Sequence, residues 1–447
     1  MTKIAKLYAD KLRTPSEAAG CVKSGDWVDY GMGANYPDLA DLALAKRKEE
    51  LTDVKIRGGL RIAPRIAVAE ADPECGTFTY NSWHFSAYER KLHDRNLCNY
   101  LPMTFRYLPY FYRRHLSVDV AFLAVSKMDE NGYFSLGLSN AAARSIVGAA
   151  KTVVLEENEH YPFTLGCGTN HTIHISEADM IVRGEHDPLA ELVNKQPSAE
   201  EIAIARHIVG MIENGSVLQI GIGSLPDVVG SLIAESDLKD LGCHSEMIGD
   251  AFVKIDKAGK LSNSRKEEHK GKSVWTLALG TKETYDWVDR NPNSWSFPVD
   301  YVNDPYVIAS NDKMICINSA LEADLYGQVC AETVGFRNIS GSGGQLDFLT
   351  GAFLSNGGKG FVCLTSTYRS PDGTQRSRIV PSMSEGNIVT DPRSQAFYIV
   401  TEYGSVNLAG LSTWERAEKM ISIAHPIFRD ELIASAEKQK IWRRSNR

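Results

Sequence analysis

The sequence predicts an α/β protein built from two similar open α/β domains with largely parallel sheets. Two observations lead to this fold class. Short apolar segments alternate with helical patterns, and one glycine-containing motif occurs twice. The length of 447 residues is enough for two domains that each bury a core of their own.

The repeated motif has the pattern of a strand, a Gly-x-Gly turn and a helix with proline in its first turn. The two copies cover residues 25–42 and 215–232. The matched residues are Gly31, Gly33 and Pro37 in the first copy and Gly221, Gly223 and Pro226 in the second. Apolar residues after the prolines also keep the same spacing, so we interpret the two halves as a duplication of one fold.

The remaining elements follow from local patterns. Buried strands are expected at 152–155, 179–182, 217–220 and 361–364, where β-branched and other apolar residues run together. A turn-rich segment at 184–188 separates the halves. Ser198 and Glu201 have the spacing of a capping box that opens a helix. We therefore place an N-terminal domain at 1–195 and a C-terminal domain at 196–447.

Composition excludes several classes of protein. The net charge of -7 argues against general nucleic-acid binding, which requires a basic surface. No run of about 18 apolar residues predicts a membrane span, and the polar start has no signal-peptide pattern. The eight cysteines include no Cys-x-x-Cys pair, which disfavours zinc ribbons and thioredoxin-type chemistry. We expect a protein of the reducing cytoplasm.

A metal site is not expected. His171, His174 and Glu177 lie close together in the sequence, but the surrounding residues have the pattern of a strand. Residues three apart on a strand point to opposite faces, so these side chains would not converge on one ion.

Glu246 is the first candidate for chemistry. It follows Gly221 by about one strand–helix–strand unit, beside a Gly-x-Gly turn that lets a ligand approach the backbone near a helix N-terminus. A carboxylate placed there can act as a covalent nucleophile on an acyl carbonyl. Without its neighbours, Glu246 is more typical of an exposed or ion-paired glutamate. The Gly-x-Gly turn alone is equally typical of a tight turn that binds no ligand. The turn lacks the third glycine of a dinucleotide fingerprint, which disfavours a nicotinamide dehydrogenase.

A second glycine-rich segment lies at 340–348. It contains Gly341, Gly343 and Gly344, followed by Gln345, and such a loop can expose N–H groups as an oxyanion hole. A flexible loop is the alternative, although apolar residues after Gln345 favour a packed one. Arg378 lies in a cationic stretch suited either to phosphates or to solvent.

These motifs together resemble the acetyl-CoA hydrolase/transferase family, within the family I CoA transferases. The resemblance covers nearly the whole chain and is most specific in the C-terminal half. It rests on residues 221–226, 244–247, 341–348, 377–381 and 400–404. Within the family, the chain looks most like enzymes that exchange CoA between butyryl-CoA and acetate, and next like 4-hydroxybutyrate CoA-transferases.

The resemblance implies an enzyme that acts on acyl-CoA and short-chain carboxylic acids through a glutamyl-CoA thioester, with Glu246 as nucleophile. It implies no metal and no cofactor beyond coenzyme A as substrate, and a homo-oligomer. The residues that it assigns to CoA or substrate binding are Gly221, Ile222, Gly223, Ser224, Leu225, Leu321, Gly341, Gly343, Gly344, Gln345 and Arg378. The loop around Gly343 and Gly344 would stabilise the oxyanion.

Some positions depart from the family pattern. Ser245 stands where relatives often have threonine, and Arg183 where they often have an acidic residue. The segment 31–36 also differs, which bears on the choice of acid. Alternatives are a 4-hydroxybutyrate, propionate or succinate CoA-transferase, an acyl-CoA hydrolase, or a CoA-responsive binding protein that would not need Glu246.

Overall fold

The computed structural model describes residues 2–63, 65–193 and 195–443. Two compact units are present. The first unit comprises Met1–Leu192, Lys272–Val302 and Ile339–Gly341, and the second comprises Val193–Gly271, Asn303–Asn338 and Ser342–Arg447. The first break along the chain thus falls between Leu192 and Val193, and two later segments group with the N-terminal part. The boundary at 195/196 stays a prediction.

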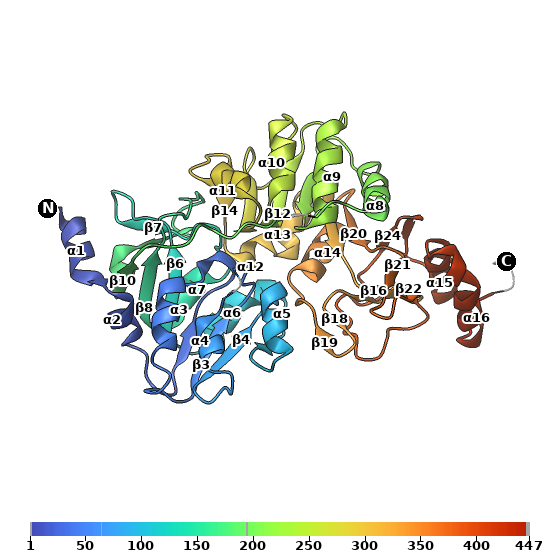
Figure 1. Ribbon diagram of the computed structural model, residues 1–447. Helices are drawn as coiled ribbons and strands as arrows, with labels where there is room; N and C mark the ends of the chain where they lie inside the picture. The colour runs from blue at the N-terminus through green and yellow to red at the C-terminus, as the bar shows by residue number, and fades with distance from the viewer. Residues whose placement is uncertain (1, 64, 194, 444–447) are drawn as a thin grey trace. The chain divides into compact units, whose positions relative to one another are not determined.

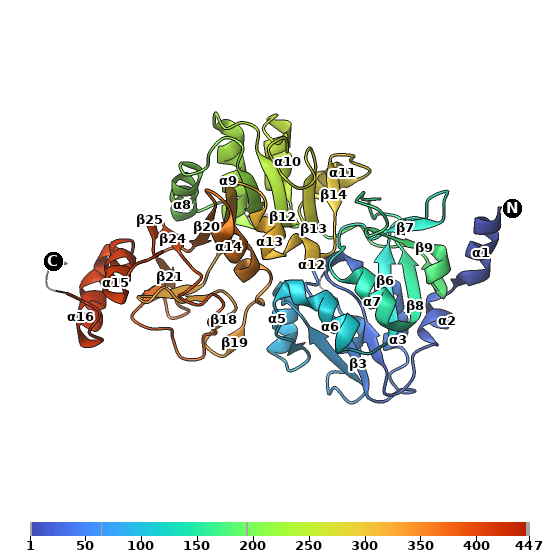
Figure 2. The ribbon, with the colours of Figure 1, turned by 180° about the vertical axis from the view of Figure 1, so that it is seen from behind.

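The first unit is built on an eight-stranded, fully parallel sheet. Its strands, in spatial order, are β1 (Leu12–Arg13), β10 (Met180–Arg183), β8 (Ala150–Glu157), β6 (Val118–Val125), β2 (Trp27–Asp29), β3 (Val54–Gly58), β4 (Phe78–Ser82) and β5 (Asn99–Tyr100). Helices α2 (Pro15–Ala19) and α3 (Asp38–Ala45) lie on one face, and α6 (Leu108–Arg114) and α7 (Ala143–Ala149) on the other (Figures 1 and 2). Parallel strands buried on both faces read as apolar runs, as in β6.

The other elements of the first unit flank this sheet. They are α1 (Lys3–Lys11), η1 (Gly33–Asn35), α4 (Ala67–Ala71), α5 (Ala87–His93), η2 (Phe105–Tyr107), β7 (Tyr133–Ser135), β9 (Thr172–His174), η3 (Ile175–Glu177), β13 (Ser273–Ala278), α11 (Lys282–Val288), β14 (Ser294–Ser296) and α12 (Val299–Val302). Strands β7 and β9 pair antiparallel, whereas β13 and β14 pair in parallel.

The second unit is built on strands that also run in parallel, except at one edge. They follow the order β12 (Gly242–Ile248), β11 (Val217–Ile220), β15 (Met314–Ser319), β20 (Lys359–Cys363), β24 (Tyr398–Thr401) and β25 (Gly404–Asn407), of which β25 is antiparallel to β24. Helices α9 (Ser224–Glu235) and α10 (Asp250–Lys257) lie side by side in both views (Figures 1 and 2). The predicted fold class, two α/β domains with largely parallel sheets, is confirmed.

The other elements of the second unit are helices around the sheet and short strands beyond its edge. They are α8 (Ala199–Val209), α13 (Pro305–Ala309), β16 (Glu322–Asp324), β17 (Val329–Cys330), β18 (Thr333–Val334), β19 (Arg337–Asn338), α14 (Gln345–Leu354), β21 (Thr367–Arg369), β22 (Gln375–Ser377), β23 (Ile379–Val380), α15 (Thr413–Ser422), η4 (Pro426–Phe428) and α16 (Arg429–Lys438). Among the described residues, no helix is long and apolar enough to cross a membrane.

The repeated motif forms the expected strand and helix in both units, with one difference. In the second copy, Pro226 lies in the first turn of α9, as predicted. In the first copy, a 3-10 turn begins at the second glycine, Gly33, and Pro37 directly precedes α3, as its N-cap. The predicted capping box of Ser198 and Glu201 is present at the start of α8.

Candidate active site

Strand β12 carries Glu246. All residues of the strand are buried except Glu246, which is half-buried. The parallel pairing sets Val217 opposite Gly242 and Leu218 opposite Cys243. Ser245 keeps that offset, because its hydroxyl donates to the Ile220 carbonyl at 3.3 Å. Glu246 therefore lies level with Gly221, where β11 has just ended.

The glycine turn leaves backbone exposed beside this carboxyl group. Gly221, Ile222, Gly223 and Ser224 are half-exposed, whereas Leu225 is buried. Gly223 has a φ of 113°, which favours glycine, and a Cβ there would meet nothing within 4 Å. The turn ends at the N-terminus of the 12-residue helix α9, whose first N–H groups lack helical partners. A ligand can thus approach the backbone closely.

The glycine-rich loop reaches the same carboxyl group. Gly343 has a φ of 54°, and Gly344 is the N-cap of α14. The Gly344 N–H donates a hydrogen bond to Glu246. A Cβ on Gly344 would lie 2.1 Å from Oε2 of Glu246 and 2.0 Å from Nδ2 of Asn303. Any larger residue here would displace the loop, the carboxyl group or the amide.

Asn303 was not predicted from the sequence, and it is the second donor to Glu246. Its Nδ2 lies 2.5 Å from Oε2 of Glu246, and its Oδ1 has no hydrogen-bond partner in the described part of the chain. Asn303 directly precedes Asp304, the N-cap of α13. That helix packs tightly against α14, because a Cβ on Gly351 would lie 2.5 Å from Ile308. The helix pair thereby places Asn303 beside Gly344.

The environment of Glu246 sets its ionisation. Burial raises the pKa of this carboxyl group to about 7, although the hydrogen bonds from Asn303 and Gly344 favour the charged form. A carboxylate with a pKa near neutrality is available as a nucleophile and is also more basic than an ordinary glutamate. Perturbed carboxyl groups of this kind cluster at functional sites.

Two further carboxyl groups, which the sequence did not single out, hold the glycine-rich loop. Oδ2 of Asp391 accepts a hydrogen bond from Nε2 of Gln345 at 2.7 Å, and Oε2 of Glu332 accepts one from Ser342 at 3.1 Å. Asp391 is fully buried, and burial raises its pKa to about 7. These contacts flank Gly344 on both sides.

Leu321 and Arg378 lie together at the same edge of the sheet. Leu321 follows the end of β15, which pairs with β11. Arg378 donates from Nη1 to the Leu321 carbonyl at 2.7 Å and stacks over the Tyr368 ring at 4.9 Å. The structure thus brings the predicted residues Gly221, Leu321 and Glu246 to the carboxyl ends of adjacent strands, where α/β sheets commonly bind ligands.

Gly341 groups with the first unit rather than with this cluster. A Cβ there would lie 3.0 Å from Nδ1 of His84 and 3.1 Å from both the Trp83 carbonyl and the Tyr100 hydroxyl. Its predicted contact with CoA stays a prediction.

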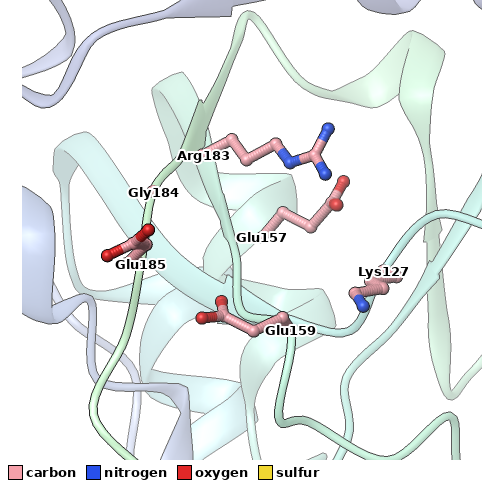
Figure 3. A pocket seen from close by; sticks show the side chains of 6 residues that line it. All are labelled: Lys127, Glu157, Glu159, Arg183, Gly184 and Glu185. Atoms are coloured by element: carbon pink, nitrogen blue, oxygen red, sulfur yellow. The ribbon is translucent and has the colours of Figure 1, made fainter.

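The first unit has a charged cavity of about 370 Å³ at the carboxyl ends of β8 and β10. Figure 3 shows Arg183 and Glu157 pointing toward one another across it, with Lys127, Glu159, Gly184 and Glu185 around them. Arg183, the departure from the family pattern, therefore stands beside carboxylates supplied by β8 and the segment after it. No group of three His, Cys, Asp or Glu side chains suited to a metal ion occurs among the described residues.

Comparisons with known proteins identify the family of this chain. Residues 2–193 match the acetyl-CoA hydrolase/transferase N-terminal domain, and residues 280–436 match the C-terminal domain of the same family. A butyryl-CoA:acetate CoA-transferase of Anaerostipes caccae is 48% identical over 98% of this chain and 99% of its own. A probable butyrate:acetyl-CoA coenzyme A-transferase of Syntrophomonas wolfei is 47% identical over 100% of this chain and 99% of its own. The crystal structure of RipA from Yersinia pestis superposes with a TM-score of 0.89 at 35% identity, covering 98% of this chain and 100% of its own.

The fold and these matches define the class: the chain belongs to the acetyl-CoA hydrolase/transferase family. It is an enzyme, a CoA transferase. The segment with Gly221 and Glu246 lies between the two matched ranges.

Proposed function

We propose that this enzyme moves CoA between butyryl-CoA and acetate, with Glu246 as the covalent nucleophile. One observation supports the role of Glu246 most directly: its carboxyl group has two hydrogen-bond donors and a pKa near 7 at the edge of the sheet. The choice of butyryl-CoA and acetate is supported by the relatives from Anaerostipes caccae and Syntrophomonas wolfei.

In the first step, the Glu246 carboxylate attacks the thioester carbonyl of the acyl-CoA. The C–S bond breaks, the CoA thiolate leaves with the electron pair, and an acyl-glutamyl anhydride forms. The thiolate then attacks the glutamyl carbonyl of that anhydride and releases the first acid as its carboxylate. The product is a glutamyl-CoA thioester, and no proton is required in the net exchange.

The second acid reverses these steps. Its carboxylate attacks the glutamyl-CoA carbonyl, the thiolate leaves, and the thiolate then takes the new acyl group from the anhydride. During attack on the glutamyl carbonyl, negative charge develops on the oxygen that was a carboxylate oxygen of Glu246. The Gly344 N–H and Nδ2 of Asn303 already point at this group, and one such donor is worth about 3–4 kcal/mol at a transition state.

The glycine turn and Arg378 belong to the proposed binding site for CoA. We propose that CoA binds along residues 221–225, of which 221–224 are half-exposed, and that Leu321 lines the thioester site. Gly341, Gly343, Gln345 and Arg378 complete the proposed binding set. Water must be kept from the anhydride, because hydrolysis would end the transfer. The enzyme is proposed to need no metal and no cofactor other than CoA itself.

Release of CoA with and without an acceptor tests this function against an acyl-CoA hydrolase. Butyryl-CoA should be stable with the enzyme alone and should yield acetyl-CoA when acetate is added. CoA released at the same rate without acetate would identify a hydrolase. A panel of propionyl-, 4-hydroxybutyryl- and succinyl-CoA donors then tests the preference, because a higher kcat/KM with one of them would replace butyryl-CoA as the proposed donor.

We further propose that the enzyme is a cytoplasmic homo-oligomer. Light scattering of the purified enzyme tests the oligomeric state.

A further inference from the structure

A chain of hydrogen bonds in the second unit crosses the carboxyl ends of three adjacent strands. The strands β24, β20 and β15 pair in parallel, and β15 pairs next with β11, which ends at the glycine turn. Glu402 follows β24 directly, Ser366 follows β20 by three residues, and Leu321 follows β15 by two. Because parallel strands end at the same edge of a sheet, this chain leads toward the site of Glu246.

The first contact of the chain joins both carboxylate oxygens of Glu402 to Ser366. Oε2 of Glu402 accepts a hydrogen bond from the Ser366 N–H at 2.8 Å, and Oε1 accepts one from the Ser366 hydroxyl. Ser366 is fully buried, and hydrogen bonds to a charged group are stronger away from water. The backbone beside Glu402 is also fixed, because the Thr401 hydroxyl donates to the Ile423 carbonyl at 2.6 Å. Glu402 is therefore able to hold Ser366 in one position.

The next contacts run through Arg378. Its N–H donates to the Ser366 carbonyl at 2.8 Å, and its carbonyl accepts from the Ala323 N–H at 2.9 Å. Its side chain donates from Nη1 to the Leu321 carbonyl at 2.7 Å and lies over the Tyr368 ring. A backbone bound on both sides and a stacked guanidinium limit the conformations of this side chain. The position of Leu321 thus depends on that of Ser366.

We propose that Glu402 is a positioning residue for acyl-chain preference: by holding Ser366, it keeps Arg378 bound to the Leu321 carbonyl and so fixes one wall of the thioester site. The inference rests on the proposed function, in which Leu321 lines that site. Glu402 does not touch the reacting atoms, and it acts only through the chain of hydrogen bonds. A fixed apolar site discriminates by about 10- to 200-fold between substrates that differ by one methylene group, and a wall that can move discriminates less.

The test is the ratio of kcat/KM with butyryl-CoA to kcat/KM with hexanoyl-CoA, with acetate as the acceptor. This ratio does not depend on the concentration of folded enzyme, so a variant that only folds poorly leaves it unchanged. Glu402→Ala should lower the ratio by about 3- to 30-fold, within the range by which residues of one hydrogen-bond network affect each other. Glu402→Gln should keep most of it, because the amide oxygen can accept from the Ser366 N–H and the hydroxyl can turn to accept from the amide nitrogen. Glu235→Ala, at an exposed position of the second unit, is the control and should match the unmodified enzyme.

A double-mutant cycle tests whether Glu402 acts through Arg378. Arg378→Ala should also lower the ratio, and adding Glu402→Ala should then change it no further, because the chain is already broken. Independent effects of the two substitutions would overturn the proposal. So would an unchanged ratio in Glu402→Ala or, if that variant does not fold, in Ser366→Ala, which removes only the hydroxyl contact and should lower the ratio in the same direction.

Borohydride trapping of the Glu402→Ala enzyme with butyryl-CoA keeps this inference apart from the proposed function. Glu246 should still be reduced in this variant, because Glu402 does not take part in the covalent steps. A reduced Glu246 together with an unchanged ratio contradicts the role of Glu402 alone, and a reduced residue elsewhere contradicts both.

Discussion

Asn303 donates a hydrogen bond from Nδ2 to Oε2 of Glu246 at 2.5 Å, across 57 positions of the sequence. The Gly344 N–H donates to the same carboxyl group, so a strand, a helix entry and a glycine-rich loop meet at one side chain. Each donor favours the charged form of Glu246, whereas burial opposes it.

Replacing the amide donor tests its part in the reaction. Asn303→Ala should lower kcat by about 10²- to 10³-fold, the usual cost of removing one preorganised donor. It should also move the acid limb of the pH profile upward, because the carboxylate loses a hydrogen bond. Asn356→Ala, at an exposed site, is the control and should leave both unchanged. Full activity in Asn303→Ala would show that the 2.5 Å contact has no catalytic role.

Adding one methyl group to the loop tests the close approach at Gly344. In Gly344→Ala the new Cβ would lie 2.1 Å from Glu246, so either the loop or the carboxyl group must move. We expect loss of CoA exchange in a protein that still folds, as circular dichroism would check. Gly148→Ala is the matched control, because a Cβ there meets nothing within 4 Å on helix α7. That variant should keep its activity and gain about 0.5–1 kcal/mol of stability.

The raised pKa of Glu246 predicts opposite effects of pH on activity and on stability. Attack requires the carboxylate, so kcat/KM should rise with pH through about 7. The folded protein holds the proton more tightly than the unfolded chain, whose glutamate pKa is near 4.5. Ionisation of Glu246 therefore does not oppose folding below about pH 4.5. As pH rises from 4.5 to about 7, it lowers the free energy of unfolding.

Glu246→Gln removes the loss of stability that comes from ionising this buried carboxyl group. The variant should be more stable than the unmodified enzyme by on the order of 1–3 kcal/mol at pH 8 and equal to it near pH 4.5, as measured by urea unfolding. Glu267→Gln, at an exposed site, should show no such difference. A Gln variant that is less stable at pH 8 would contradict the burial argument.

His186 in the first unit predicts a separate dependence on pH. Burial alone would lower the pKa of His186, but hydrogen bonds with Glu156 at 3.1 Å and Glu159 at 2.7 Å raise it to about 8. Protonated His186 therefore contributes its full stabilisation to the folded protein below about pH 6.5, and this contribution is lost as pH rises through 8. His186→Ala should cost about 1–2 kcal/mol more at pH 6 than at pH 9. The exposed His115→Ala is the control, and an equal cost at both pH values would contradict the charged bridge.

Local patterns in the sequence predicted the parts of the site that depend on the local chain. The glycine turn at Gly221 and the capping box at Ser198 were predicted because turns and caps require particular residues at fixed spacing. Glu246 could be paired with the turn because parallel strands one unit apart end at the same edge of a sheet. The position of Pro37, just before α3 rather than inside it, was missed because a 3-10 turn intervenes.

Residues placed by tertiary packing could not be predicted in this way. Asn303 is positioned by the contact of α13 with α14 at Gly351, and nothing in the sequence around Asn303 indicates Glu246. Asp391 and Glu332 reach the glycine-rich loop from segments outside the motifs. Gly341 belongs to the motif by sequence but packs against His84 and Tyr100, which are distant in the chain. Such relations follow from side-chain packing and not from spacing.

Trapping the intermediate tests the central claim most directly. The enzyme is incubated with butyryl-CoA in the absence of acetate, treated with borohydride, digested and mapped by mass spectrometry. The account predicts that the side chain of Glu246 alone is reduced to a primary alcohol, losing one oxygen and gaining two hydrogens, and that acetate added before borohydride diminishes the product. A reduced residue other than Glu246, or no reduced residue in an enzyme that exchanges CoA, would contradict the account.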